Sequence, residues 1–212
     1  MKLVLKRCAV MGATLTATTL TSLGAYVMDQ IGPPFAIQLP PTPNVEMGQN
    51  PAFSTFAYDD FMVAFAGGVN FVEVHTWATG LTASSSWPQT VPWVVTIVTD
   101  LGGTPMGSVI YSFVVPGASV VTVHNNYSLN WGSGVVNAIV RVPLPSPALA
   151  PGAYWVSCTP RDSSGGWYGL GDSVWTPGFP HNGNAFLNNP GNGYGLGVWV
   201  PMAKNWPYRV DM

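Results

Sequence analysis

Hydrophobic and polar residues alternate along the chain from about residue 52 to its end. Within residues 69–77, Val72, Val74 and Thr76 point to one face and Glu73 and His75 to the other, as expected for a strand with one face in a core. The same alternation, or a short apolar run, predicts strands over residues 91–99, 108–115, 119–124, 135–142, 153–159, 194–200 and 206–211.

Glycine and proline separate these segments. The 24 glycines and 20 prolines are spread between apolar runs, which is typical of short strands joined by tight turns. No amphipathic helical segment of roughly ten or more residues lies between the strands, which disfavours a parallel sheet. We therefore predict a single all-β domain over residues 52–212, an antiparallel two-sheet sandwich of jelly-roll type.

Charged residues are scarce and unevenly placed. They make up 8% of the chain, against 47% hydrophobic residues, so intrinsic disorder is excluded. Beyond residue 25 there are four basic and nine acidic residues, a net charge of about −5. A chain of this kind lacks the basic surface that phosphate backbones require, so we expect no nucleic-acid partner.

The N-terminus has the pattern of an export signal. Residues 1–7 are basic and residues 8–24 are uncharged and moderately apolar. We predict a signal peptide over residues 1–25, cleaved after Gly24 or Ala25, and hence a secreted or cell-surface protein without membrane contact after cleavage. An uncleaved transmembrane anchor is the alternative, which the five threonines in residues 8–24 disfavour.

Residues 26–51 are rich in proline. Proline fixes φ and lacks an N–H donor, which excludes a helix or a central strand here. We predict a semi-extended spacer or, because Phe35, Ile37 and Leu39 alternate with Ala36 and Gln38, an ordered arm along the domain.

Three stretches together resemble a known group of domains. They are Ala57-Tyr58-Asp59-Asp60-Phe61, residues 100–111 (DLGGTPMGSVIY), and residues 149–157 (LAPGAYWVS) followed by Trp167-Tyr168. They are similar to secreted bacterial β-sandwich domains, many of which carry a C-terminal sorting anchor of the PEP-CTERM or choice-of-anchor type. The resemblance covers residues 52–212 and implies the fold and export, without a specific activity. Residues 208–212 lack the apolar helix and basic tail of such anchors, so anchoring at this end is not expected.

Asp59, Asp60 and Asp100 are the candidate metal ligands. Ca²⁺ binds six to eight oxygen atoms, and carboxylates are its usual protein ligands. Adjacent strand residues point to opposite faces, however, so Asp59 and Asp60 cannot act together on one face. The alternative is that these carboxylates stabilise turns. We expect no other cofactor.

No catalytic motif is evident. His75, His124 and His181 lack the spacing of known metal motifs, and no nucleophile motif surrounds the serines. His124 lies near Glu73 and His75 only if its strand neighbours theirs. Cys8 falls in the predicted signal peptide, which leaves Cys158 as a buried small apolar residue. We predict a non-enzyme, with a secreted hydrolase as the remote alternative.

Residues 161–199 are rich in glycine, asparagine and aromatic residues. Aromatic rings beside amides can hold sugars by stacking and hydrogen bonding, and the alternative is a minor core under an irregular loop. The candidate ligand-binding residues are Trp167, Tyr168, Trp175, Asn182, Asn184 and Tyr194.

Two functions fit these observations. The first is a non-catalytic extracellular structural or assembly protein, which associates with itself or with a cell-surface polymer because low charge permits close packing. The second is a carbohydrate-binding module that binds a glycan through residues 161–199. The sequence leaves the ligand and the oligomeric state open.

Overall fold

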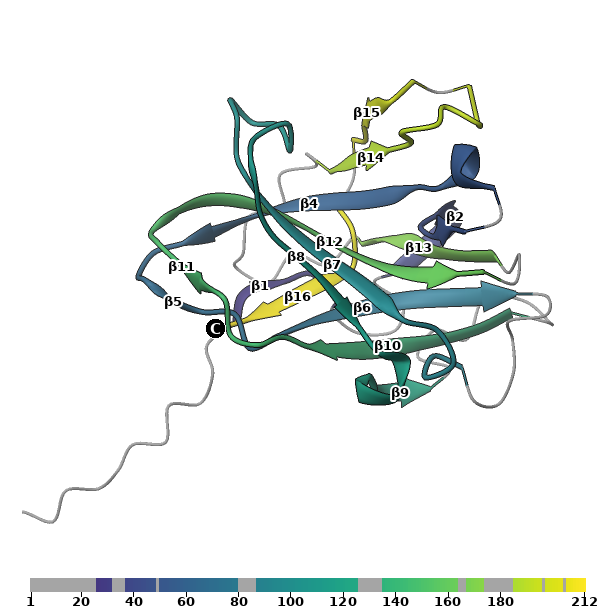
Figure 1. Cartoon of the computed structure of the whole chain (residues 1–212), viewed down its shortest axis with the longest axis horizontal. Helices are drawn as coiled ribbons and strands as arrows, with labels where there is room; N and C mark the ends of the chain where they lie inside the picture. Colours follow the sequence, from purple (N-terminus) through teal and green to yellow (C-terminus); the bar gives the residue numbers. More distant parts are fainter. Residues whose placement is uncertain are drawn as a thin grey trace, which may run out of the picture.

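The computed structural model describes residues 26–31, 37–48, 50–79, 87–125, 135–163, 167–173, 185–195, 197–203 and 205–212, with the backbone alone for 26–27, 37–43, 167 and 171–173. This part of the chain contains strands and two short 3-10 turns but no α-helix. Two large antiparallel sheets pack face to face (Figure 1), which confirms the predicted sandwich. Within the same residues, no helix has the length and apolar character needed to cross a membrane.

The first sheet, called the β6 sheet, has the strand order β1-β16-β6-β10-β9. The C-terminal part of β6 also pairs with β13, which pairs in turn with β2. The strand bounds are β1 (Tyr26–Asp29), β2 (Ile37–Pro43), β6 (Phe71–Thr79), β9 (Val121–Asn125), β10 (Val135–Pro143), β13 (Trp167–Ser173) and β16 (Tyr208–Asp211).

The second sheet, called the β4 sheet, has the order β15-β14-β4-β12-β7-β8, and β3 joins β12 as a parallel neighbour. A two-stranded pair of β5 and β11 lies apart from both sheets. The bounds are β3 (Glu46–Met47), β4 (Phe56–Val63), β5 (Gly67–Gly68), β7 (Trp93–Thr99), β8 (Val109–Val115), β11 (Ala148–Leu149), β12 (Gly152–Asp162), β14 (Phe186–Asn188) and β15 (Trp199–Pro201), with 3-10 turns η2 (Pro51–Phe53) and η4 (Gly117–Ser119).

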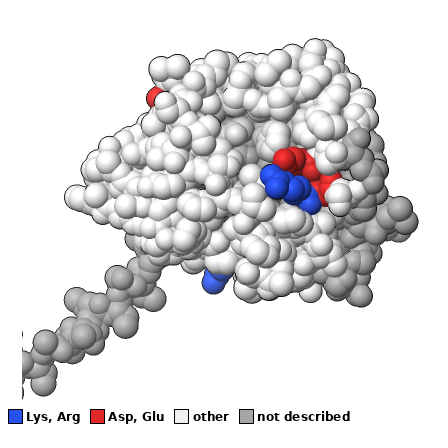
Figure 2. Space-filling model, viewed as in Figure 1, with Lys and Arg blue, Asp and Glu red and all other residues white. Residues whose placement is uncertain are grey.

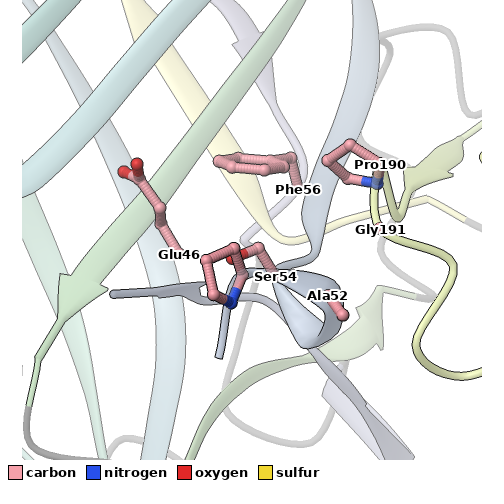
Figure 3. Close-up of a pocket in the computed structure, with 7 residues that line it drawn as sticks. Glu46, Ala52, Ser54, Phe56, Pro190 and Gly191 are labelled. Atoms are coloured by element: carbon pink, nitrogen blue, oxygen red, sulfur yellow. The ribbon is translucent and has the colours of Figure 1, made fainter. Parts of the chain in front are cut away.

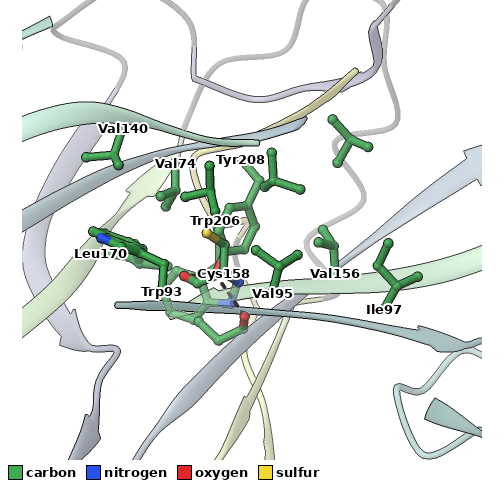
Figure 4. Close-up of a cluster of buried hydrophobic side chains, with 14 of the residues drawn as sticks. Val74, Trp93, Val95, Ile97, Val140, Val156, Cys158, Leu170, Trp206 and Tyr208 are labelled. Atoms are coloured by element: carbon green, nitrogen blue, oxygen red, sulfur yellow. Dashed lines mark hydrogen bonds between the residues drawn. The ribbon is translucent and has the colours of Figure 1, made fainter. Parts of the chain in front are cut away.

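The core lies between the sheets. Inward-facing valines of β6 and β10 meet valines, Cys158 and Trp93 of the β4 sheet, as Figure 4 shows. Cys158 is fully buried, and burial raises the pKa of its thiol. Its position confirms the prediction of a small apolar core residue rather than a reactive thiol.

Two polar side chains complete the β4 sheet from inside. β12 pairs with only the C-terminal part of β4. Beyond that point Asn44 Nδ2 donates to Cys158 O (2.9 Å), while Asn44 Oδ1 accepts from Ala57 N (3.1 Å). The Tyr208 hydroxyl, which comes from the opposite sheet, donates to Ala57 O (2.9 Å). Buried backbone groups need such partners, so Asn44 and Tyr208 replace ladder bonds and tie the sheets together.

Opposite charges alternate across four neighbouring strands on the outer face of the β6 sheet. Arg141, Glu73, Arg209 and Asp29 are successive cross-strand partners on β10, β6, β16 and β1. Glu73 contacts both arginines at 2.6 Å, and Arg209 contacts Asp29 at 3.1 Å. We call these four residues the charge row. Glu73 is fully buried, so the row neutralises a carboxylate that would be costly alone.

The predicted strands match the observed ones within a few residues, with one exception. The described residues before Trp199 in the segment 194–200 are not in a strand, and the strand there is the short β15. A turn forms because Asn189 Oδ1 accepts from Tyr194 N and Asn192 Oδ1 accepts from Gly197 N, so two side chains bond to the backbone locally.

The described parts of the proline-rich segment 26–51 lie along the domain formed by the rest of the chain. Its strands β1 and β2 pair with β16 and β13, and β3 pairs with β12. Of the two interpretations left open by the sequence, the structure favours the ordered arm over a free spacer. β1 and β2 lie at sheet borders, where proline is tolerated.

Candidate functional site

The two aromatic candidates whose side chains the structure describes, Tyr168 and Tyr194, do not share one surface. Tyr168 is fully buried in the core, with its ring 6.3 Å from that of Trp87. Tyr194 is half-buried and packs edge-on against Phe53 at 5.1 Å, and burial raises its pKa. For Trp167 the structure describes only the backbone, which belongs to β13. Trp175, Asn182 and Asn184 lie outside the described residues, as does His181.

Two described asparagines of this region, Asn189 and Asn192, form hydrogen bonds with the backbone. Asn189 is fully buried, and its Nδ2 donates to Ala52 O (2.9 Å) and Ser54 O (2.8 Å). Gly193 N also donates to Ala52 O (2.8 Å), and a Cβ at Gly191 would collide with the Ala52 backbone. The turn at residues 189–195 is thus fixed closely against η2, and its amides and glycines are explained by that contact.

The candidate metal ligands are separated. Asp59 points into the core, while Asp60 lies on the opposite face of β4, as predicted from strand alternation. Asp59 accepts from Asp60 N (3.0 Å) and Trp206 N (2.5 Å), and burial is the main cause of its raised pKa. Within the described residues, no three His, Cys, Asp or Glu side chains gather into a metal-binding group.

Asp100 stabilises a turn. Its Oδ2 accepts from Gly103 N (3.0 Å) and its Oδ1 accepts from Trp155 Nε1 (2.8 Å). Gly102 and Gly103 have φ of 63° and 83°, a conformation that favours glycine. The turn-stabilising alternative proposed from the sequence thus describes the contacts of Asp100.

His75 and His124, the two histidines that the structure describes, do not form a shared site. His75 is fully buried, and its Nε2 lies 3.1 Å from Asn137 Oδ1. Burial lowers the pKa of His75 to about 4. His124 is exposed on β9, and Ile139 of β10 lies between the two as the cross-strand partner of both. The strand of His124 therefore does not neighbour that of His75, because β10 lies between β6 and β9.

An aromatic cluster covers the outer face of the β4 sheet. Trp155 and Tyr58 are buried there, and Phe56, Phe186 and Trp199 pack against them half-buried. The Trp155 ring meets Phe186 edge-on at 5.4 Å, and the Tyr58 ring lies 5.5 Å from Trp199. Burial raises the pKa of Tyr58 to about 12, so its hydroxyl is neutral at physiological pH.

A pocket of about 470 Å³ opens beside this cluster. It is lined by Glu46, Pro51, Ala52, Ser54, Phe56, Pro190 and Gly191. Figure 3 shows the Phe56 ring between the Glu46 carboxylate and Pro190. The volume falls in the range of roughly 300–1,000 Å³ that is common for small-ligand sites, and a mainly apolar lining with few polar groups is also common.

The charged side chain that lines the pocket, Glu46, is one half of an ion pair. Glu46 Oε2 accepts from Arg161 Nε at 2.6 Å, and both side chains are partly exposed. The two residues are cross-strand partners because β3 runs parallel to the end of β12. The pocket edge thus offers an acceptor and a donor side by side.

Sequence reasoning missed the pocket residues Glu46, Phe56 and Pro190. Glu46 and Phe56 flank η2, and Pro190 lies in a turn more than a hundred residues later. No strand was predicted around Phe56, and no local signal shows that β3 and the later turn meet there. Residues 161–199 were selected for their aromatic content, and this range includes Trp199 of the observed cluster.

Comparison with known proteins adds no relative. No protein-family model matches the chain, and no curated protein matches it. The resemblance to secreted bacterial sandwich domains therefore stays a prediction.

Proposed function

We propose that this chain is a non-catalytic, exported structural protein that assembles by pairing the edge strand β8 with a second copy. The observation that carries the proposal is the character of this edge. β8 reads VIYSFVV and contains neither a charged residue nor a proline. Val109 and Val114 are 62% and 52% exposed. A long, apolar, unprotected edge strand readily pairs with another strand.

The opposite edge of the same sheet differs. β15 has three residues and ends in Pro201, and both shortness and proline block strand addition. In the β6 sheet, the edge strand β1 has four residues and carries Asp29 of the charge row, and the other edge strand, β9, has five residues that include the polar Thr122, His124 and Asn125. Among the described edges, β8 therefore combines length with an apolar, uncharged sequence, and antiparallel pairing of two identical copies would bring no like charges together.

The rest of the surface also favours close packing. On the face shown in Figure 2, charged atoms are confined to one cluster of both signs and small isolated spots. The cause is partly internal pairing, since Arg141, Arg161 and Arg209 all form ion pairs. These are three of the four basic residues beyond residue 25. Low net repulsion supports self-association, and the basic and apolar N-terminus supports export.

Sedimentation of the purified mature chain over a wide concentration range tests the proposal. We expect dimers or larger species that Val114→Lys reduces to monomer, because a charge on the edge blocks pairing. Met62→Lys is the matched control, since Met62 is 56% exposed on the central strand β4, and it should leave association unchanged. A wild-type monomer at every concentration would contradict the proposal, as would equal effects of the two lysines.

Carbohydrate binding is the second proposed function. The half-buried aromatic side chains on the outer face of the β4 sheet and the adjoining pocket favour it. These residues are not the candidate ligand-binding residues predicted from the sequence of 161–199. Of those candidates, Tyr168 lies in the core. Loss of glycan binding on removal of outer-face rings would support this function.

A further inference from the structure

Two aromatic rings and an amide form a row across three strands. Asn188 of β14 is the cross-strand partner of both Trp199 on β15 and Phe56 on β4. Directly paired residues point to the same side of a sheet, and Trp199 and Phe56 belong to the same outer-face cluster. Neighbouring strands lie about 4.8 Å apart, so the backbones of β15 and β4 that carry the two rings are roughly 10 Å apart, with β14 and its amide between them. All three side chains are half-exposed.

The pocket continues this row at the Phe56 end. Phe56 is both the last ring of the row and a wall of the pocket, which Glu46 also lines (Figure 3). Glu46 in turn pairs with Arg161. Apolar ring faces and hydrogen-bonding groups thus follow each other along one line. We call Trp199, Asn188, Phe56, Glu46 and Arg161 the outer-face site.

The outer-face site is held in place before any ligand arrives. The turn that forms one pocket wall is fixed to η2 by three hydrogen bonds from Asn189 and Gly193. β14 is paired on both sides, by β4 and β15. A site built on strands and a fixed turn loses little conformational entropy when it binds.

We propose that the outer-face site binds a neutral oligosaccharide, with sugar rings stacked on Trp199 and Phe56. This inference names the site of the second proposed function and is independent of assembly through β8. Asn188 donates to and accepts from hydroxyl groups between the two rings. Glu46 and Arg161 bind neighbouring hydroxyls of one sugar, since a hydroxyl both donates to a carboxylate and accepts from a guanidinium.

The chemistry of the site selects this class of ligand. Stacking on an aromatic ring needs a flat apolar face, which a sugar presents on the side of its axial hydrogens. The charges of Glu46 and Arg161 cancel, so a charged group gains no net attraction at this position. An extended row also fits a chain of sugars better than a single one, because its side chains come from three neighbouring strands.

The test is saturation-transfer NMR and calorimetry with three neutral probes, cellohexaose, maltohexaose and chitohexaose. We expect the wild-type chain to bind at least one of them. Trp199→Ala should weaken binding about tenfold or more, as expected for loss of one stacked ring. Glu46→Gln should also weaken binding while leaving the fold intact, because its ion pair is partly exposed. Val198→Ala, an exposed neighbour of Trp199, is the control and should bind as wild type.

Two results would overturn the inference, and they differ in what they say about carbohydrate binding. Should the wild-type chain bind none of the probes, both the outer-face site and the carbohydrate-binding function fall. Should it bind while Trp199→Ala and Glu46→Gln bind equally well, carbohydrate binding stands but takes place elsewhere on the chain.

Discussion

Two glutamate–arginine pairs in this molecule have the same length but different surroundings. Glu73–Arg141 in the β6 sheet and Glu46–Arg161 beside the β4 sheet both close to 2.6 Å. Their arginines are similarly exposed, at 39% and 41%. Their carboxylates differ, because Glu73 is fully buried whereas the Glu46 side chain is 29% exposed.

The difference teaches that burial of the carboxylate, and not the contact distance, decides what such a pair does. Glu73 has no access to water, so it needs both Arg141 and Arg209 to offset its desolvation. Arg141 also stacks over the Phe71 ring at 4.2 Å, which orients it for this contact. Water can replace either partner around Glu46, so that pair is available to a ligand.

The same substitution in both pairs gives the largest expected contrast. Glu73→Gln should lower the free energy of unfolding by about 3 kcal/mol, because it leaves two arginines facing a neutral side chain in a buried place. Urea unfolding at neutral pH measures the loss. A loss below about 1 kcal/mol would mean that water reaches Glu73 in solution.

The second largest effect is expected from acid, which should lower the free energy of unfolding through the buried residue His75. The pKa of His75 is 6.5 when unfolded and about 4 in the fold. Between these values the unfolded chain takes up a proton that the native chain excludes, so stability is full above pH 6.5 and falls as the pH drops. The loss from this residue should reach about 2 kcal/mol near pH 5.

Replacing the imidazole isolates this contribution. His75→Gln should be less sensitive to pH than the wild-type chain over the range from pH 8 to pH 5, whatever its stability at pH 8. Urea unfolding of both proteins at each pH gives the comparison. Identical pH profiles would show that His75 titrates normally in the fold and that this face is open to water.

The smallest effect is expected at the exposed pair. Glu46→Gln should change the free energy of unfolding by less than about 1 kcal/mol, as is usual for surface ion pairs. Urea unfolding beside Glu73→Gln provides the matched measurement. If Glu46→Gln proved as costly as Glu73→Gln, the contrast in burial would not explain the two pairs.

Much of the fold followed from local pattern. Period-2 alternation located β6, β7, β8, β9, β10, β12 and β16 within a few residues, since each has one face in a continuous core. β13 and β14 were not predicted, because Gly169, Gly171 and short length hide the alternation there. The order of strands in each sheet also lay beyond local pattern.

The candidate site was less accessible to sequence reasoning. Tyr168 was a candidate ligand-binding residue with a core position as the alternative, and the structure places its side chain in the core. Aromatic residues look alike in sequence whether they fill a core or cover a surface, and only the partner strands decide between the two. The outer-face site joins β3, β4, the end of β12, β14 and β15, which lie far apart along the chain.

The sequence by itself determined that this chain forms stacked antiparallel sheets, that its charge is low, and that Cys158 is a core residue. These properties depend on composition and on the side-chain period of a strand, both of which are local. Only the tertiary structure decided which strands became edges, which charges met across the β6 sheet, and which rings faced outward. Those outcomes depend on pairing between distant segments, and the sequence of one strand does not indicate which other strand it will pair with.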